Sequence, residues 1–310
     1  MNSIVSIGML AARYGRTLLI AGLLVGIFVP GLALMMKDWL PELVAMLLFL
    51  GAFRIGPYDA LAAFRNMTSA LGIVLIFQLL LPVIFVLLLL AAGYKGSVLI
   101  ASLALMLSAP SISGSPNLTI MTGHDPAPAL QLLVVGTALM PLTFFPTFWL
   151  LPDLGSTELV IKAAFRLLLV IAMATGVAFF LRWAFLKHPG LETMKAIDGY
   201  SAVALGVMVI GLMSSVGPTM FGDPAKFALW LGIAFLANFG LQIFVWFGLR
   251  HRIQPGQQVP ASIIAGNRNI ALYLVGLPAS VTDPLLLFIG CYQIPMFMTP
   301  LLLKRMYAKD

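Results

Sequence analysis

Two short polar stretches interrupt the long apolar runs of this chain, and they hold most of the side chains that could bind a ligand. They read Ser113-Gly114-Ser115-Pro116-Asn117 and Gly266-Asn267-Arg268-Asn269. Proline donates no backbone hydrogen bond and glycine tolerates unusual dihedral angles, so carbonyl and amide groups beside them are released from a helix. Released carbonyls can bind cations, and the N-termini of half-helices can bind anions. The substrate-binding residues that we expect here are Ser113, Gly114, Ser115, Asn117, Gly266, Asn267, Arg268 and Asn269.

Arg268 is the most informative single residue, because it falls in the middle of an apolar segment. A guanidinium near the centre of a bilayer costs at least ~2.5 kcal/mol, so it must face a cavity, a carboxylate or backbone carbonyls. No Asp or Glu stands in mid-segment, and the nearest acidic candidates, Asp125 and Asp283, lie at segment ends. One interpretation is that Arg268 binds an anionic substrate, since its fork of donors suits a carboxylate, sulfonate or phosphate. The alternative is that Arg268 caps carbonyls across a helix break.

The composition places these residues in an integral membrane protein. Of 310 residues, 61% are hydrophobic and 9% are charged, whereas soluble domains are roughly a quarter charged. The formal net charge of +7 requires no nucleic-acid partner, because the basic residues gather at segment ends, where they orient membrane proteins. A single cysteine, Cys291, excludes an intrachain disulfide and any multi-cysteine metal site.

Ten segments are long and apolar enough to cross a hydrocarbon core of ~30 Å as helices. Their predicted spans are 17–36, 39–55, 69–92, 97–122, 127–151, 160–186, 199–217, 226–249, 259–277 and 283–303. Between the second and third spans, the residues from Tyr58 to Arg65 form either a short helix on the membrane surface or a loop. The whole chain is therefore predicted to be an all-α membrane domain.

The two halves of the chain resemble each other at an offset of about 152 residues, the separation of Ser113 from Ala265. Each polar stretch falls in the fourth segment of its half. Each is followed by two prolines spaced five apart, which are Pro141, Pro146, Pro295 and Pro300. Five crossings per half is an odd number, so the halves must be inverted relative to each other, as in many secondary transporters. We expect ten transmembrane helices in two inverted five-helix repeats, residues 1–155 and 156–310.

Each interruption taken alone could be a structural kink, because glycine and proline are frequent in membrane helices. The recurrence of the interruption at matched positions, with an asparagine in each, favours a functional interpretation.

The distribution of basic residues predicts that both termini are cytoplasmic, because cytoplasmic loops carry an excess of Lys and Arg. With the N-terminus inside, twelve basic residues fall on the cytoplasmic side: Arg13, Arg16, Arg54, Arg65, Arg182, Lys187, Lys195, Arg250, Arg252, Lys304, Arg305 and Lys309. Five fall outside: Lys37, Lys95, Lys162, Arg166 and Lys226. We therefore expect a multi-pass protein of the cell (inner) membrane.

These features resemble the bile acid:sodium symporter superfamily, and the similarity runs over nearly the whole chain. Members have ten helices in two inverted repeats, with the fourth and ninth helices unwound and crossing at the centre. The family's Gly-Ser-Ser-Asn-like patch corresponds to Gly114-Ser115-Pro116-Asn117, and its Glu-x-Gly-x-Gln-Asn patch to Ile264-Ala265-Gly266-Asn267-Arg268-Asn269. The resemblance implies that Asn117 and Asn269 lie at the crossing. Gln78 resembles a glutamine of the third helix in the family, and by this resemblance we expect it to be a further substrate-binding residue. Its alternative role is a hydrogen bond that packs helices.

Two departures from the family pattern concern the coupling ion. Ile264 stands where the family's sodium-binding glutamate would be, and Arg268 stands where its glutamine would be. Leu130 and Val134 occupy the approximate places of hydroxyl ligands in the fifth helix. Sodium needs oxygen ligands, and a nearby positive charge repels it. The usual sodium ligands are therefore absent by this comparison, so we expect no cofactor or metal, and uniport, exchange or proton coupling remain open.

The resemblance implies a carrier that moves a small organic anion by alternating access. The alternatives are a related crossover-helix carrier, such as an auxin-efflux-like or cation/proton antiporter protein, and a membrane sensor that transports nothing. An enzyme is not expected, because a membrane enzyme would need a nucleophile with its base or paired carboxylates at depth. His124, His188 and His251 fall in predicted loops without metal-ligand spacing. The oligomeric state and the substrate stay open, and membrane lipid is the only other partner that we expect.

Overall fold

The computed structural model describes residues 3–65, 67–94, 96–151, 156–187 and 189–308. The regular secondary structure of these residues is helical, apart from one isolated bridge between Ser111 and Arg268. Lys95, His188 and Lys309, as well as the predicted boundary between the halves at residue 155, lie outside the described residues. The prediction of an all-α membrane protein is confirmed at this level.

Seven helices within the described residues are long and apolar enough to cross a membrane. They are Leu40–Arg65, Thr68–Ala91, Ala127–Trp149, Thr157–Phe185, Leu191–Leu212, Pro224–Arg252 and Ala279–Leu302. An eighth crossing is formed if the pair Ser3–Arg13 and Gly15–Phe28, bent by 70°, counts as one span. The chain is therefore a multi-pass membrane protein.

The fourth and ninth predicted segments are divided into pieces too short to cross a membrane. Segment 97–122 consists of α7 (Val98–Ser108) and α8 (Ser115–Met121). Segment 259–277 consists of α14 (Gln258–Gly266), the 3-10 turn η5 (Ile270–Leu272) and α15 (Tyr273–Gly276). These are the two segments in which the sequence predicts a break.

The contacts divide the chain into two compact units, and each unit takes residues from both halves of the sequence. Unit 1 comprises Met1–Leu61 and Leu168–Ala228, and unit 2 comprises Ala62–Leu167 and Leu229–Asp310. Unit 1 contains α1 (Ser3–Arg13), α2 (Gly15–Phe28), α3 (Pro30–Lys37), α11 (Leu191–Leu212), α12 (Val216–Gly222) and parts of α4 (Leu40–Arg65), α10 (Thr157–Phe185) and α13 (Pro224–Phe244).

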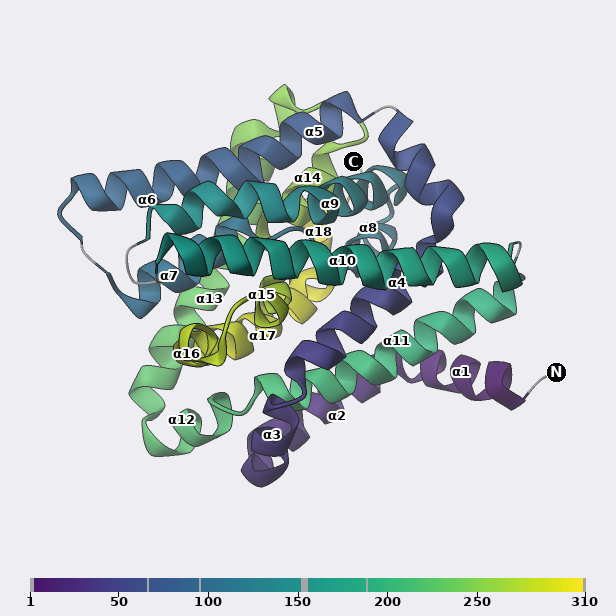
Figure 1. Ribbon diagram of the computed structural model, residues 1–310, viewed down its shortest axis with the longest axis horizontal. Helices are drawn as coiled ribbons and strands as arrows, with labels where there is room; N and C mark the ends of the chain where they lie inside the picture. The colour runs from purple at the N-terminus through teal and green to yellow at the C-terminus, as the bar shows by residue number, and fades with distance from the viewer. Residues whose placement is uncertain (1–2, 66, 95, 152–155, 188, 309–310) are drawn as a thin grey trace. The chain divides into compact units, whose positions relative to one another are not determined.

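Unit 1 is held together by the close approach of α11 to α1 and α2 (Figure 1). Glycines make this approach possible, because a side chain on them would meet the backbone of the neighbouring helix. A Cβ atom built on Gly199 of α11 would overlap the carbonyl oxygen of Gly8 in α1, and one built on Gly22 of α2 would overlap that of Gly206 in α11. Small residues at such contacts are the usual way in which membrane helices pack.

A kink in α4 is the second feature of unit 1. Gly56 has a φ of 78°, and Pro57 follows it. Proline has no N–H, so the carbonyl of Phe53, four residues earlier, loses its helical donor. Arg182 of α10 replaces that donor, because its Nη1 lies 2.9 Å from the Phe53 carbonyl oxygen. Residues 58–65, predicted as either a surface helix or a loop, continue α4 as a helix beyond this kink.

One ion pair joins α4 to α11 beside the kink. Nε of Arg54 lies 2.5 Å and Nη2 lies 3.4 Å from the two carboxylate oxygens of Asp198. Both side chains are about one-third exposed, so the pair contributes orientation more than stability.

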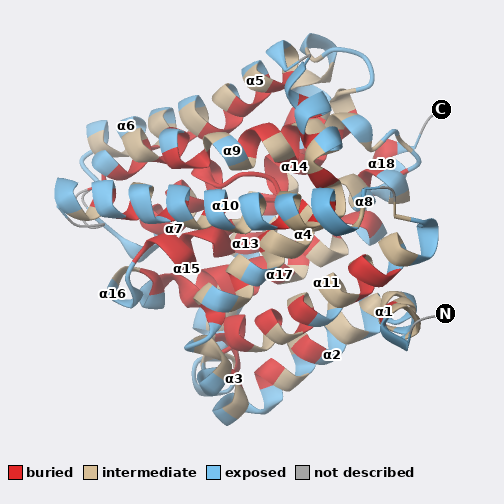
Figure 2. Ribbon diagram, turned by 45° about the vertical axis from the view of Figure 1, so that its right-hand side comes forward, coloured by how far each residue is buried: buried red, intermediate tan, exposed pale blue. Residues whose placement is uncertain are grey.

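Unit 2 contains the remaining helices. These are α5 (Thr68–Leu75), the π-helical turn η1 (Ile76–Leu80), α6 (Leu81–Ala91), α7, α8, α9 (Ala127–Trp149), the π-helical turn η3 (Val245–Leu249), η4 (Arg250–Arg252), α14, η5, α15, α16 (Ala279–Thr282), η6 (Asp283–Leu285), α17 (Leu286–Leu302) and α18 (Lys304–Tyr307). Figure 2 shows buried residues gathered on α9, α14 and α17.

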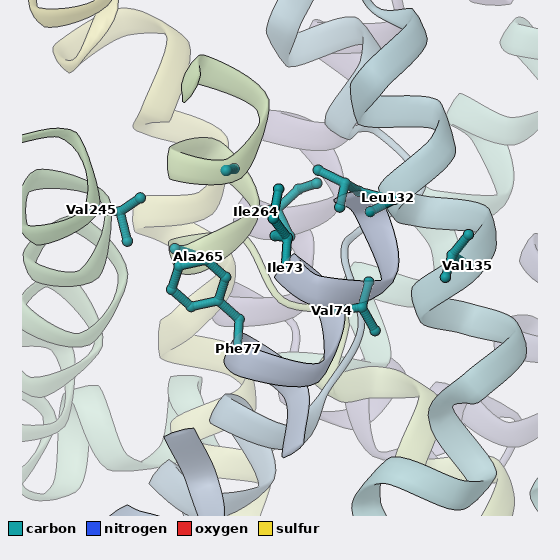
Figure 3. Close-up of a cluster of buried hydrophobic side chains, with 10 residues drawn as sticks. Ile73, Val74, Phe77, Leu132, Val135, Val245, Ile264 and Ala265 are labelled. Carbon is teal, nitrogen blue, oxygen red and sulfur yellow. The ribbon is translucent and has the colours of Figure 1, made fainter. Parts of the chain in front are cut away.

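One core cluster of unit 2 consists of aliphatic side chains and Phe77 around the end of α14 (Figure 3). It joins α5 and η1 to α9, η3 and α14, and its members are Ala70, Ile73, Val74, Phe77, Leu132, Val135, Val245, Ala261, Ile264 and Ala265. Ile264 is 5% exposed in this cluster. The position where the resembled family has a sodium-binding glutamate is therefore packed by apolar atoms.

The first predicted segment differs most from the structure. Residues 17–36 were expected as one helix, but the chain leaves helical geometry at Val29 (φ −120°, ψ 71°) between α2 and α3. Pro30 explains the break, since a proline disfavours the helical conformation of the residue before it and supplies a suitable first residue for the next helix.

The glycine contact in unit 1 predicts a selective loss of stability. Gly199→Ala should lower the stability by about 1–3 kcal/mol, because the methyl group has no room against the Gly8 backbone. Thermal unfolding of the purified protein in detergent measures this loss. The matched control is Gly176→Ala in α10, where a Cβ meets nothing within 4 Å. Equal melting temperatures for the two variants would contradict the tight α1–α11 contact.

Candidate functional site

The break between α7 and α8 follows directly from its two prolines. Pro110 disfavours the helical conformation at Ala109, which is extended (φ −71°, ψ 148°). The helix resumes at Ser115 with Pro116 in its first turn, the position at which a missing N–H costs nothing. The chain between these points has left the helical ladder and must find other hydrogen-bond partners.

The break after α14 contains no proline and depends instead on a close helix contact. A Cβ built on Gly266 would overlap the carbonyl oxygen of Asn238 in α13. The Gly266 carbonyl accepts hydrogen bonds from Asn238 Nδ2 at 2.5 Å and from the hydroxyl of Tyr292. Because these side chains occupy the carbonyl, the helix ends there, and Asn267 takes the non-helical angles φ −103° and ψ 88°.

The two broken segments lie side by side and bond to each other through their backbones. Ser111 and Arg268 form an isolated antiparallel bridge. The N–H of Asn269 donates to the carbonyl of Pro110 at 2.8 Å, and the N–H of Ile112 donates to the carbonyl of Asn267 at 3.2 Å. Each break therefore satisfies part of the backbone that the other leaves free.

Arg268 lies at this junction, and its guanidinium donates to carbonyls of three segments. Nε lies 3.1 Å from the Ala265 oxygen, Nη1 lies 3.0 Å from the Ala109 oxygen, and Nη2 lies 3.2 Å from the Phe77 oxygen. The residue is 2% exposed. The guanidinium carbon also lies 6.0 Å from the centre of the Phe77 ring. Within the described residues Arg268 forms no ion pair with a carboxylate.

The Phe77 carbonyl is free because of the π-helical turn η1. In that turn the N–H of Leu81 donates to Ile76, one residue further back than in an α-helix. The next residue, Pro82, has no N–H, so neither of them serves Phe77. A carbonyl in this position needs a donor from elsewhere in the protein, and Arg268 supplies it.

A buried polar network on the other side of Asn267 was not predicted from the sequence. Asn267 Oδ1 accepts hydrogen bonds from Asn238 Nδ2 at 3.3 Å and from Thr299 Oγ1 at 3.1 Å. Gln242 Nε2 donates to Asn238 Oδ1 at 2.7 Å and to Thr299 Oγ1 at 3.2 Å. All four side chains are fully buried. A signal for them exists in the sequence, because Asn238 and Gln242 are four residues apart in an apolar segment and so share one helix face.

The network ends at the C-terminal helix α18. The hydroxyl of Tyr307 donates to Gln242 Oε1 at 3.1 Å and lies 2.8 Å from Ser262 Oγ. Burial raises the pKa of Tyr307, and the hydrogen bond with Ser262 lowers it by less. The hydroxyl therefore keeps the proton that it donates.

The structure brings some of the predicted site residues together and leaves others apart from the junction. Ser115, Gly266, Asn267 and Arg268 are buried at or beside the paired breaks, and the Ser111 hydroxyl donates to Ser115 Oγ at 2.7 Å. Gly114 and Asn269 are half-buried, and Ser113 and Asn117 are exposed.

Gln78 is buried and serves the packing of α9 against η1. Its Nε2 donates to the Gly136 carbonyl at 3.0 Å and to Thr143 Oγ1 at 2.9 Å. Both partners belong to α9, although Gln78 is next to Phe77 in the chain. These hydrogen bonds are of the kind that packs one helix against another.

No group of three or more His, Cys, Asp or Glu side chains that could hold a metal occurs within the described part of the chain. Cys291 is buried in α17. The chemistry that the junction offers therefore consists of a guanidinium, amides, hydroxyls and backbone groups. No protein-family model matches the chain, and a comparison with curated proteins gives no match.

Arg268→Lys tests the capping of the three carbonyls. The variant keeps the charge, but a single ammonium cannot reach carbonyls in three directions, and each unsatisfied carbonyl costs about 1–3 kcal/mol. We expect a clearly lower melting temperature of the purified protein in detergent. Arg166→Lys, on an exposed position of α10, is the matched control and should melt like the native protein. An unchanged melting temperature for Arg268→Lys would refute the capping role.

Proposed function

We propose that this protein is a secondary transporter, not an enzyme, and that it moves a small organic anion across the membrane by alternating access. The observation that carries the proposal is the pair of membrane segments that are broken side by side, with the bridge between Ser111 and Arg268 at their centre. Non-helical backbone at membrane depth is tolerated only where it is buried in protein or lines an aqueous cavity. Carriers build their substrate sites from such interrupted helices.

The charge of Arg268 supports an anionic substrate. The three carbonyls around its guanidinium carry only partial negative charge, and within the described residues no carboxylate balances it. A guanidinium has five N–H donors, and these contacts use one on each nitrogen. One N–H on each terminal nitrogen therefore remains for a carboxylate, sulfonate or phosphate, so an anion can bind while the backbone stays capped.

The proposed site also includes polar groups that the protein itself does not occupy. The side chains of Asn117 and Ser113 are exposed next to the break and make no hydrogen bond within the described residues. Ser115, Asn267 and Asn269 complete the proposed site, and the side chains of Ser115 and Asn267 also form hydrogen bonds within the protein. Because Arg268 is buried, the anion can reach it only after an opening movement, as alternating access requires.

The proposal includes no sodium ion at this site. Ile264 belongs to the apolar cluster of unit 2, and a cation beside Arg268 would be repelled. Uniport, exchange and proton coupling are all compatible with these residues.

The wider architecture that we propose is ten transmembrane helices in two inverted repeats, residues 1–155 and 156–310, in the cell membrane with both termini cytoplasmic. The seven long helices and the bent pair supply eight crossings, and the two broken segments supply the others. The resemblance to the bile acid:sodium symporter superfamily supports the same plan. Two compact units are also what a rigid-body transport movement needs.

Asn117→Ala tests the proposed site without disturbing its support, since Asn117 is exposed. Purified protein is screened for small organic anions that raise its melting temperature, with and without sodium. A hydrogen bond from the Asn117 side-chain amide to an anion contributes about 1.5–3 kcal/mol. The variant should therefore bind a stabilising anion roughly ten-fold to 100-fold more weakly. Uptake of that anion into proteoliposomes should fall in parallel.

The matched control is Gln254→Ala, an exposed amide in the loop before α14, which should bind the anion like the native protein. Equal stabilisation of the native protein and Asn117→Ala would refute the proposed site. Stabilisation that depends on sodium would refute the sodium-free mechanism while leaving the carrier in place.

A further inference from the structure

A cavity of about 380 Å³ lies in unit 1 at the kink of α4. This volume is within the range of roughly 300–1,000 Å³ that ligand sites have. The lining comes from α4, the end of α10 and the start of α11, and consists of Ile55, Gly56, Pro57, Tyr58, Asp59, Arg182, Trp183, Lys187, Pro189 and Met194. We call it the α4–α10 pocket. It shares no residue with the paired breaks of unit 2.

The kink itself creates the pocket and fixes one cation in its wall. At Gly56 the chain takes a φ of 78°, and a Cβ there would lie 3.5 Å from Arg182 Cγ. Arg182 is 8% exposed. Its hydrogen bonds to the carbonyls of Phe53 and Arg54 and to Met194 Sδ all start from Nη1. Within the described residues Nε and Nη2 donate to no protein atom, so these donors remain for a ligand in the pocket.

The pocket lies at the level where membrane helices meet water. The apolar span of α10 ends at Phe185 and that of α11 begins at Leu191, with Lys187 between them. Tyr58 and Trp183 are 59% and 49% exposed, and the ammonium of Lys187 lies 5.3 Å from the centre of the Trp183 ring. Exposed Tyr and Trp are enriched at the headgroup layer of the bilayer.

We propose that the α4–α10 pocket binds the phosphoryl group of an anionic phospholipid. Arg182 and Lys187 provide two cations against the single carboxylate of Asp59, and basic pockets between membrane helices bind anionic headgroups. Exposed apolar side chains at Leu61 and Phe185 offer contacts for the acyl chains. A soluble phosphate could use the same cations, so the experiment separates the two sources.

Two substitutions with opposite signs test the pocket. The melting temperature of the purified protein is measured against the concentration of phosphatidylglycerol. Lys187→Gln removes an exposed cation and should raise the lipid concentration that gives half of the maximal stabilisation by roughly five-fold. Asp59→Asn removes the opposing charge and should lower that concentration by a similar factor. Arg182→Gln is not used, because it also removes the donor to Phe53. The matched control is Lys195→Gln, an exposed cation of α11 outside the lining, which should behave like the native protein.

The reference arms are phosphatidylcholine, which is neutral overall, and inorganic phosphate. Stabilisation by phosphatidylglycerol alone, weakened in Lys187→Gln and strengthened in Asp59→Asn, supports a lipid site. Equal responses to inorganic phosphate and phosphatidylglycerol, with the same dependence on both residues, support the phosphoryl site but assign it to a soluble anion. Equal shifts in Lys187→Gln and Lys195→Gln would show general surface attraction and overturn the proposal, as would equal stabilisation by phosphatidylcholine.

Discussion

A carbonyl that loses its helical donor inside an apolar medium must find another one, and this requirement organises the protein. An unsatisfied backbone group in hydrocarbon costs several kcal/mol, which no surrounding lipid can offset. At the junction of unit 2 the carbonyls of Phe77, Ala109 and Ala265 are all capped by Arg268. The breaks that make a binding site conceivable are thus the same features that require a buried cation. Stability and the proposed function share one residue.

In unit 1 an arginine also caps a carbonyl that a proline has released. Pro57 deprives Phe53 of its donor, and Arg182 from a distant helix replaces it. In each unit a proline releases a carbonyl and an arginine from the other half of the sequence caps it. The difference lies in the surroundings, because Arg182 lines an open pocket whereas Arg268 is enclosed by backbone and the Phe77 ring.

The sequence predicts the helical membrane class from hydropathy, and it predicts the places where two segments break from the local glycine, proline and polar residues of each stretch. It does not predict which groups donate hydrogen bonds to the carbonyls that the breaks release. The donors to Phe77 and Ala109 are 191 and 159 residues away in the chain, and no local pattern encodes that pairing. The sequence leaves two roles open for Arg268, which are to bind substrate or to cap carbonyls. The structure shows its contacts with carbonyls. The exposed positions of Ser113 and Asn117 likewise depend on tertiary packing.

The same long separation bears on how the protein is made. A ribosome adds roughly 5–20 residues per second, so the carbonyl of Phe77 waits on the order of ten seconds or longer before Arg268, 191 residues later, has been synthesised. During that time the second half cannot supply the cap. The growing chain must therefore keep this region hydrated or shielded by the insertion machinery, and the central helices can settle only after the second half has arrived.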